Sequence, residues 1–336
     1  MGKYKKIYVL APYAYTTGGV ELAHQLVDYL RNNGEQAFIV YINNNEITSE
    51  SKVTEAYNKY NIEIATEIED SNENILVLPE IYFDWIYEYR YIQIGCWWMS
   101  VDNHYNACTF KDALRYRKGF IRKMKLLRWL NPYKRISYRN SIMDLKKNER
   151  RITHFYQSHY AQYHLYTLGF SKVLPLSDYI NMEFVDFNQA EKENIILYNP
   201  AKGLKHIHKL MRYMPNHNFV PLKKLSRMQL KELFGKAKLY VDFGYFPGKD
   251  RLFREAACSG CCIMTGKEGA SFFYEDVAIS EEYKFDIRNT STIKIVDKIN
   301  YILDNYSQCI NEFEFLRTRV KEERTIFYKE IESIFM

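Results

Sequence analysis

Residues 241–265 read VDFGYFPGKDRLFREAACSGCCIMT, and this stretch decides the fold of the C-terminal half of the chain. The apolar run 239–243 is followed by the turn Pro247-Gly248, a short helix that Gly260 closes, and a second apolar run, 261–265. Continuous apolar strands on either side of a helix are typical of a parallel sheet that is buried on both faces.

The start of this short helix combines cations with a hydrogen-bond acceptor. We expect the helix to open at Lys249 and Arg251, with Glu255 one turn further on. The amides at a helix N-terminus are unpaired and carry a partial positive charge, so cations there are disfavoured unless an anion binds. Cations, free amides and one acceptor together suit a diphosphate that is joined to a polyol, as in a nucleotide-sugar.

Strands and helices alternate along the chain in two runs, which predicts an α/β protein with two Rossmann-like domains. The parallel sheets of such domains bind ligands beyond the carboxyl ends of their strands, so we expect the site in a central cleft that both sheets face. The expected strands are residues 7–11, 37–42, 75–78, 92–97, 153–157, 173–176, 195–198, 219–222, 239–243 and 261–265. The expected parts are an N-terminal domain, 1–187, a C-terminal domain, 188–310, and a C-terminal helix, 311–336, that packs back on the N-terminal domain.

Length and composition indicate a globular protein of two domains. The chain has 336 residues, 47% of them hydrophobic, and no apolar run approaches the roughly 18 residues that a membrane span needs. Six cysteines in a chain of this size do not form a disulfide framework, which indicates a reducing, cytosolic compartment. The formal net charge is +6.

The basic character is concentrated in residues 111–151. This segment holds 15 Lys or Arg against 3 acids, a balance of +12, so the remaining residues sum to −6. A cationic helix with Trp and Leu suits an anionic membrane surface, where it would bring the protein to a lipid-linked acceptor. A solvated insertion is one alternative. Nucleic acid is another, and the lack of a recognised binding module disfavours it.

Three segments, in this order, resemble the large retaining family of GT-B glycosyltransferases with a Glu-x7-Glu motif. They are residues 17–21, TGGVE, residues 199–203, NPAKG, and residues 254–261, REAACSGC. Two departures mark a divergent member. Pro247 stands where the family has its first glutamate, and the arginine that usually precedes the Lys-Gly pair is absent.

The resemblance implies roles for residues of the C-terminal domain. Lys202 would contact the donor diphosphate, with Lys249, Arg251 or Arg254 replacing the missing arginine, and Glu255 would accept from the ribose hydroxyls. Asp250 would face the donor sugar. The alternatives are a solvated loop lysine at 202, an ion pair of Glu255 with Arg251, and a helix-capping role for Asp250.

In the N-terminal domain, Gly18 and Gly19 let the backbone approach a phosphate or sugar closely, or else form a tight turn without a ligand. The loop 97–104, WWMSVDNH, follows a strand at the expected cleft. Asp102 or His104 there is a candidate to orient or deprotonate an acceptor hydroxyl, and a tryptophan to stack on a sugar. Since no Asp-x-Asp motif or metal-ligand histidine spacing is present, we expect no metal and no cofactor beyond the nucleotide-sugar co-substrate.

Together these features predict a cytosolic glycosyltransferase, peripheral on the inner face of the plasma membrane if 111–151 binds lipid. It would move a hexosyl group from a nucleotide-sugar to a glycan or lipid-linked hydroxyl, as in bacterial surface polysaccharide synthesis. The rival functions are a non-catalytic nucleotide-sugar-binding protein, a nucleic-acid-binding protein, and a nicotinamide-dependent oxidoreductase. The missing G-x-G-x-x-G fingerprint disfavours the oxidoreductase.

Overall fold

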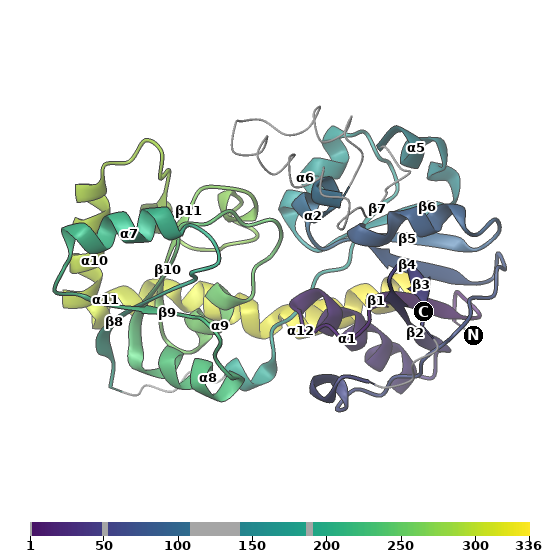
Figure 1. The fold of residues 1–336 in the computed structure, drawn as a ribbon, viewed down its shortest axis with the longest axis horizontal. Helices are drawn as coiled ribbons and strands as arrows, with labels where there is room; N and C mark the ends of the chain where they lie inside the picture. Colours follow the sequence, from purple (N-terminus) through teal and green to yellow (C-terminus); the bar gives the residue numbers. More distant parts are fainter. Residues whose placement is uncertain (1, 49–52, 108–141, 186–190) are drawn as a thin grey trace. The chain divides into compact units, whose positions relative to one another are not determined.

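The computed structural model describes residues 2–48, 53–107, 142–185 and 191–336 (Figure 1). The chain forms two compact units. Unit 1 comprises Met1–Gln157, Ala161–Ser177 and Phe327–Met336, and unit 2 comprises Ser158–Tyr160 and Asp178–Ile326.

Unit 1 is built on a seven-stranded sheet in the order β3-β2-β1-β4-β5-β6-β7, parallel except for β3. Its strands are β1 (Ile7–Pro12), β2 (Ala37–Asn43), β3 (Glu46–Ile47), β4 (Ile75–Pro79), β5 (Gln93–Trp98), β6 (Ile152–Tyr156) and β7 (Val173–Pro175). Ile7 pairs with Ala37 on one side and with Ile75 on the other, so β1 lies inside the sheet. The residues of these central strands are almost all buried, as expected for a sheet covered on both faces.

In the described part of unit 1 the α-helices are α1 (Gly18–Asn32), α2 (Val101–Ala107), α5 (Ile142–Lys147) and α6 (His159–Thr167), which begins in unit 2. The last part of α12 (Glu314–Phe335) also belongs to unit 1. There the ring of Phe327 stacks on Trp97 with centroids 6.4 Å apart, and Phe335 packs against Phe155 at 5.8 Å.

Unit 2 has a five-stranded parallel sheet in the order β12-β11-β10-β8-β9. The strands are β8 (Glu193–Tyr198), β9 (Asn218–Pro221), β10 (Ala237–Asp242), β11 (Cys262–Gly266) and β12 (Lys284–Phe285). The helices are α7 (Leu204–Tyr213), α8 (Arg227–Lys236), α9 (Leu252–Cys258), α10 (Thr292–Asp304), α11 (Tyr306–Cys309) and most of α12. The predicted α/β class with two Rossmann-like sheets and C-terminal helices is confirmed.

Two boundaries differ from the sequence-based expectation. Unit 2 takes up the chain again at Asp178 rather than near residue 188, because Ile180 and Phe184 are buried in the core of unit 2. The helix α9 begins at Leu252 rather than at Lys249. Its preceding loop is held by side-chain contacts that the local pattern does not reveal.

Most of the basic segment 111–151 lies outside the described residues. Its described end contains α5 and a short 3-10 helix, Glu149–Arg151. Among the described residues, no helix combines the length and the apolarity that a membrane span requires.

The core of unit 1 encloses four histidines. Burial lowers the pKa of His24 and His164 to about 4 and that of His104 and His154 to about 3. These rings are therefore neutral in the folded chain, whereas an unfolded histidine takes up a proton near its ordinary pKa of about 6.5.

We expect the free energy of unfolding of unit 1 to fall as the pH drops from about 6.5 towards 4, by about 1.4 kcal/mol per pH unit for each neutral histidine. The sign follows because only the unfolded chain binds the four histidine protons in this range, and Glu80, whose pKa burial raises to about 7, offsets only one of them. All described tryptophans lie in unit 1, so urea unfolding followed by their fluorescence measures it.

His104→Phe should reduce the slope of the free energy of unfolding by the contribution of one histidine, about 1.4 kcal/mol per pH unit. A phenylalanine suits this position because His104 packs among aromatic rings. His208→Asn, at an exposed position of α7, is the control and should leave it unchanged. A free energy of unfolding that stays constant between about pH 7 and pH 5 would contradict the prediction.

Candidate functional site

The loops that follow β8 and β10 meet at the carboxyl edge of the sheet of unit 2. The ammonium of Lys202, after β8, lies 2.5 Å from a carboxylate oxygen of Asp250 and 3.2 Å from one of Asp242. Asp242 ends β10, and Asp250 lies in the loop before α9. Parallel strands bring such segments together at the edge where open α/β sheets bind ligands.

Two glycines make this approach possible. Gly203 has φ +70°, and a Cβ there would lie 2.6 Å from the amide nitrogen of Gly244. A Cβ on Gly244 would in turn lie 2.5 Å from Cγ of Lys202. The aliphatic part of the Lys202 side chain therefore packs against the main chain of Gly244, and its ammonium lies 3.9 Å from the ring centre of Phe246.

The charges of Lys202, Asp242 and Asp250 shift the pKa values of one another. Burial raises the pKa of Asp242, Lys202 opposes the rise, Asp250 adds to it, and the result is about 6. Burial also disfavours ionisation of Asp250, but Lys202 and the Leu252 amide outweigh it and hold the pKa of Asp250 below its usual value. Burial opposes the charge of Lys202, but the two carboxylates outweigh it and raise the pKa of the lysine.

Glu255 belongs to the same neighbourhood. It lies on α9 and is 8% exposed. The hydroxyl of Tyr240 donates to Asp242 at 3.1 Å, and burial, together with the negative charges of Asp242, Asp250 and Glu255, raises the pKa of this tyrosine well above its usual value. The structure thus brings Lys202 and Asp250 together, as the sequence suggested, and adds Asp242, while Glu255 lies in the first turn of α9, shortly after Asp250 in the chain.

Arg254 does not face this cluster as a free cation. Its two terminal nitrogens donate to both oxygens of Asp178, at 3.0 and 2.7 Å, and one of them also to Glu323, at 2.7 Å. Its remaining N–H groups donate to the main-chain oxygens of Asp250, at 3.0 Å, and Lys249, at 3.3 Å. A guanidinium has five N–H donors, and all five are used here. Arg254 therefore has no donor left for a diphosphate.

Lys249 and Arg251 precede the helix instead of opening it. The ammonium of Lys249 lies 2.7 Å from Glu323, and Nε of Arg251 lies 3.9 Å from Asp178. Protein carboxylates, rather than the bound anion that the sequence suggested, neutralise Lys249. Asp178 and Glu323 carry no local signal in the sequence, since they lie 76 and 69 residues from Arg254.

In unit 1 the loops after β1 and β5 are neighbours. Gly18 and Gly19 are the first two residues of α1, and the hydroxyl of Thr17 caps the helix by accepting from the Val20 amide. A Cβ on Gly19 would lie 3.2 Å from the sulfur of Met99. The glycine loop and the loop 97–104 therefore adjoin, as the two predicted parts of an acceptor site would.

The polar residues of the loop 97–104 differ in access. Asp102 lies half-buried in the first turn of α2, whereas His104 is fully buried, with its pKa lowered by burial to about 3. Without access to solvent, His104 does not fit the predicted role of an acceptor base.

Glu80, which the sequence did not single out, lies beside His104. It is 3% exposed, its carboxylate accepts from the Met99 amide at 3.2 Å, and burial raises its pKa to about 7. It holds the loop in place from within.

The two tryptophans of this loop are core residues. Trp97 and Trp98 are both 0% exposed. The indole N–H of Trp97 donates to the main chain of Leu176 at 2.8 Å, and that of Trp98 to His154 at 3.0 Å. The suggestion that one of them stacks on a sugar is therefore wrong, because strand β5 turns both rings inward.

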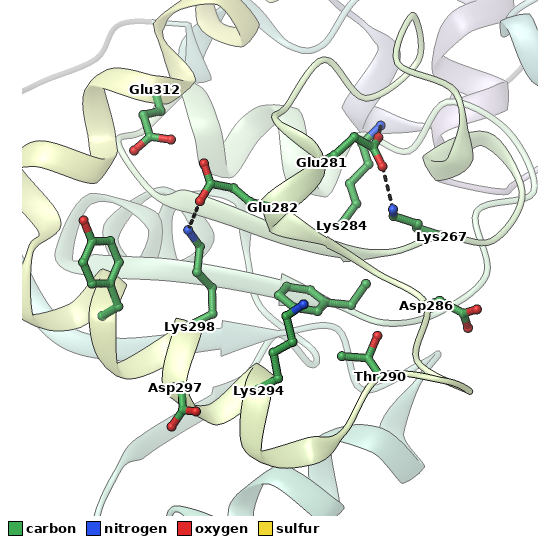
Figure 2. Close-up of a pocket in the computed structure, with 12 residues that line it drawn as sticks. Lys267, Glu281, Glu282, Lys284, Asp286, Thr290, Lys294, Asp297, Lys298 and Glu312 are labelled. Atoms are coloured by element: carbon green, nitrogen blue, oxygen red, sulfur yellow. Dashed lines mark hydrogen bonds and ion pairs between the residues drawn. The ribbon is translucent and has the colours of Figure 1, made fainter.

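A hollow of unit 2, about 750 Å³ in volume, lies beside β12 and α10 (Figure 2). Lys267 pairs with Glu281 at 2.6 Å, and Lys298 pairs with Glu282 at 2.6 Å. Among the residues that line it, five acids face four lysines, which does not suit a diphosphate. None of the predicted donor-site residues lines it.

The chain thus has two Rossmann-like units, and a lysine lies at the carboxyl edge of the second sheet. Comparisons with known proteins show which fold this is. No protein-family model matches the sequence, and no curated protein matches it. Solved structures do match. HepE from Anabaena, in complex with UDP-glucose, has a TM-score of 0.59 and 9% identity over 98% of both chains.

Two further structures agree. Sucrose-phosphate synthase from Thermosynechococcus elongatus has a TM-score of 0.61 and 11% identity, over 98% of this chain and 96% of its own. TarM, from S. aureus, has a TM-score of 0.52 and 12% identity, over 80% of this chain and 54% of its own. All three are GT-B glycosyltransferases, and the chain described here has the GT-B fold.

The electrostatic coupling at Lys202 is directly testable. We expect Lys202→Met to raise the pKa of Asp242 above its value of about 6, because the lysine is the group that opposes the effect of burial. A carbon-13 NMR titration of the aspartate carboxyl groups measures the shift. Lys209→Met, on the exposed face of α7, is the matched control. An unchanged or lowered pKa of Asp242 would refute the coupling.

We expect Arg254→Met to lower the free energy of unfolding of unit 2 by about 3–5 kcal/mol, the cost of leaving buried carboxylates without their partner. Glu232→Gln breaks an exposed ion pair with Lys236 in the same unit and should leave stability nearly unchanged. Hydrogen exchange of the α9 amides in urea reports on both variants. Equal stabilities of the two would show that the buried contacts contribute little.

Proposed function

We propose that this protein is a glycosyltransferase that uses a nucleotide-sugar donor, a divergent member of the retaining Glu-x7-Glu group. The observation that carries the proposal is the ammonium of Lys202, held between Asp242 and Asp250 at the carboxyl edge of a GT-B unit. The complex of HepE with UDP-glucose supports a nucleotide-sugar as the ligand of this fold.

In the proposed reaction the donor binds to unit 2. Lys202 contacts the diphosphate and stabilises the negative charge that grows on it as the glycosidic bond breaks. Glu255 accepts hydrogen bonds from the ribose hydroxyls. Asp250 contacts the donor sugar near the position of the missing first glutamate. The resemblance to the retaining family suggests that the configuration of the sugar carbon is retained, and the missing first glutamate leaves inversion as the alternative.

The proposed acceptor is a hydroxyl group of a glycan or a lipid-linked sugar, as in bacterial surface polysaccharide synthesis. It binds to unit 1 beside Gly18, Gly19 and the loop 97–104. Asp102 is the proposed group that orients or deprotonates the hydroxyl, since it is more accessible than His104. The basic segment 111–151 provides the contact with an anionic membrane. No metal ion takes part in this proposal, because the sequence has no Asp-x-Asp motif.

Two observations favour a second function, a nucleotide-sugar-binding protein without transferase activity. Pro247 replaces a residue that the related enzymes use at the donor sugar, and Lys202 is already paired with two carboxylates. Release of free nucleoside diphosphate from the bound donor separates the two. Transfer or slow hydrolysis supports the enzyme, whereas binding without turnover supports the binding protein.

We expect a thermal-shift panel of UDP, GDP, ADP, CMP and dTDP with their sugars to show stabilisation by one nucleotide class. Lys202→Met should weaken that binding about ten- to a hundredfold, the usual range for a lost charge-assisted hydrogen bond. Glu255→Gln should weaken the binding of nucleotides, which carry a ribose, more than the binding of inorganic pyrophosphate, which does not.

Lys209→Met is the control and should bind like the wild type. Wild-type affinity in both Lys202→Met and Glu255→Gln would place the donor elsewhere. No stabilisation by any nucleotide would remove the proposed function itself.

A further inference from the structure

Arg254 links buried charge to the shape of the donor loop. Two of its five N–H groups hold the main-chain oxygens of Lys249 and Asp250, at 3.3 and 3.0 Å. These carbonyls lie in the loop before α9, and Arg251, at the helix N-cap, makes no side-chain capping bond. The guanidinium therefore fixes the loop at the residue whose side chain faces Lys202.

Asp250 passes this constraint to the lysine. One oxygen of its carboxylate accepts from the Leu252 amide at 3.0 Å, and the other lies 2.5 Å from the ammonium of Lys202. Since main chain and carboxylate of Asp250 are both held, the ammonium has a defined position.

The carboxylates that orient Arg254 come from both ends of the long segment of unit 2. Asp178 is the first residue of Asp178–Ile326, and Glu323 lies on α12 shortly before its end. Both accept from the same terminal nitrogen of Arg254, at 3.0 and 2.7 Å. The places where the chain enters and leaves this segment are thus tied to the donor loop through one side chain.

We infer that Arg254 is a positioning residue of the donor site, which sets the place of the Lys202 ammonium through the main chain and carboxylate of Asp250 without touching the donor. Asp178 and Glu323 contribute to the same positioning indirectly, because they orient Arg254. The expected effect on donor affinity rests on the proposed function. The expected effect on the position of the Lys202 ammonium is independent of that function.

Arg254→Lys tests the inference most directly. It keeps the charge, but one ammonium cannot hold two carbonyl groups and two carboxylates at once. Glu323→Gln is the milder variant, because its amide oxygen still accepts from Arg254, and it decides the matter if Arg254→Lys does not fold by circular dichroism. Glu232→Gln, which breaks an exposed pair of the same unit, is the matched control.

The first measurement needs no ligand. Acetylation of Lys202, followed by mass spectrometry, should become about fivefold faster in Arg254→Lys and about twofold faster in the milder Glu323→Gln, because a loosened Asp250 raises the pKa of the lysine less. Acetylation of Lys209, which is exposed on α7, corrects for general effects. An unchanged rate at Lys202 in a folded variant overturns the inference.

The second measurement compares UDP with UMP by calorimetry. We expect the affinity for UDP to fall about tenfold and that for UMP to change less than about twofold, since Lys202 serves the diphosphate. Equal losses for both would mean a merely structural role and overturn the inference. Faster acetylation in a chain whose wild type binds no nucleotide would keep the inference and refute the proposed function.

Discussion

The buried guanidinium of Arg254 is the constraint on which the ordering of unit 2 depends. An ion removed from water costs several kcal/mol unless partners replace the lost hydration. Here Asp178 and Glu323 supply the opposite charge, and two carbonyl oxygens satisfy the remaining donors. Because these partners come from distant parts of the chain, the arrangement is complete only when α9, α12 and the segment that starts at Asp178 have all docked. The loop that carries Asp250 is shaped as a result.

A second charged group, smaller and more accessible, lies next to the first. Lys202 and its two aspartates carry one positive and two negative charges, so any anion that binds the lysine competes with a carboxylate. This arrangement differs from a helix start that attracts phosphate with its amides. The helix α9 has only 7 residues, and the cations before it are directed at protein carboxylates. The specificity of the site therefore comes from side chains that are positioned one by one.

The fold was predictable because its signals are local. Each of the ten expected strands forms within a residue or two of its predicted bounds, since a strand buried on both faces needs a continuous apolar run such as the one that ends at Asp242. The strands β3 and β12 were missed because two residues carry no periodicity. The start of α9 was misplaced for another reason. The pattern from Lys249 onward is compatible with a helix, but Arg254 holds two carbonyl groups of this segment, and the Asp250 carboxylate is held by the Leu252 amide and by Lys202, so the segment stays a loop.

By itself, the sequence determined the alternation of strands and helices, the two α/β units, and the presence of Lys202 and Asp250 at one edge of a sheet. These follow from hydrophobic periodicity and from the rule that the carboxyl ends of parallel strands share an edge. Only the tertiary structure decided which charges meet. It directed Arg254 and Lys249 to Asp178 and Glu323, buried Trp97 and His104, and added Asp242 to Lys202. A charged side chain is as compatible with water as with a distant partner, so its role is fixed only when packing removes the water.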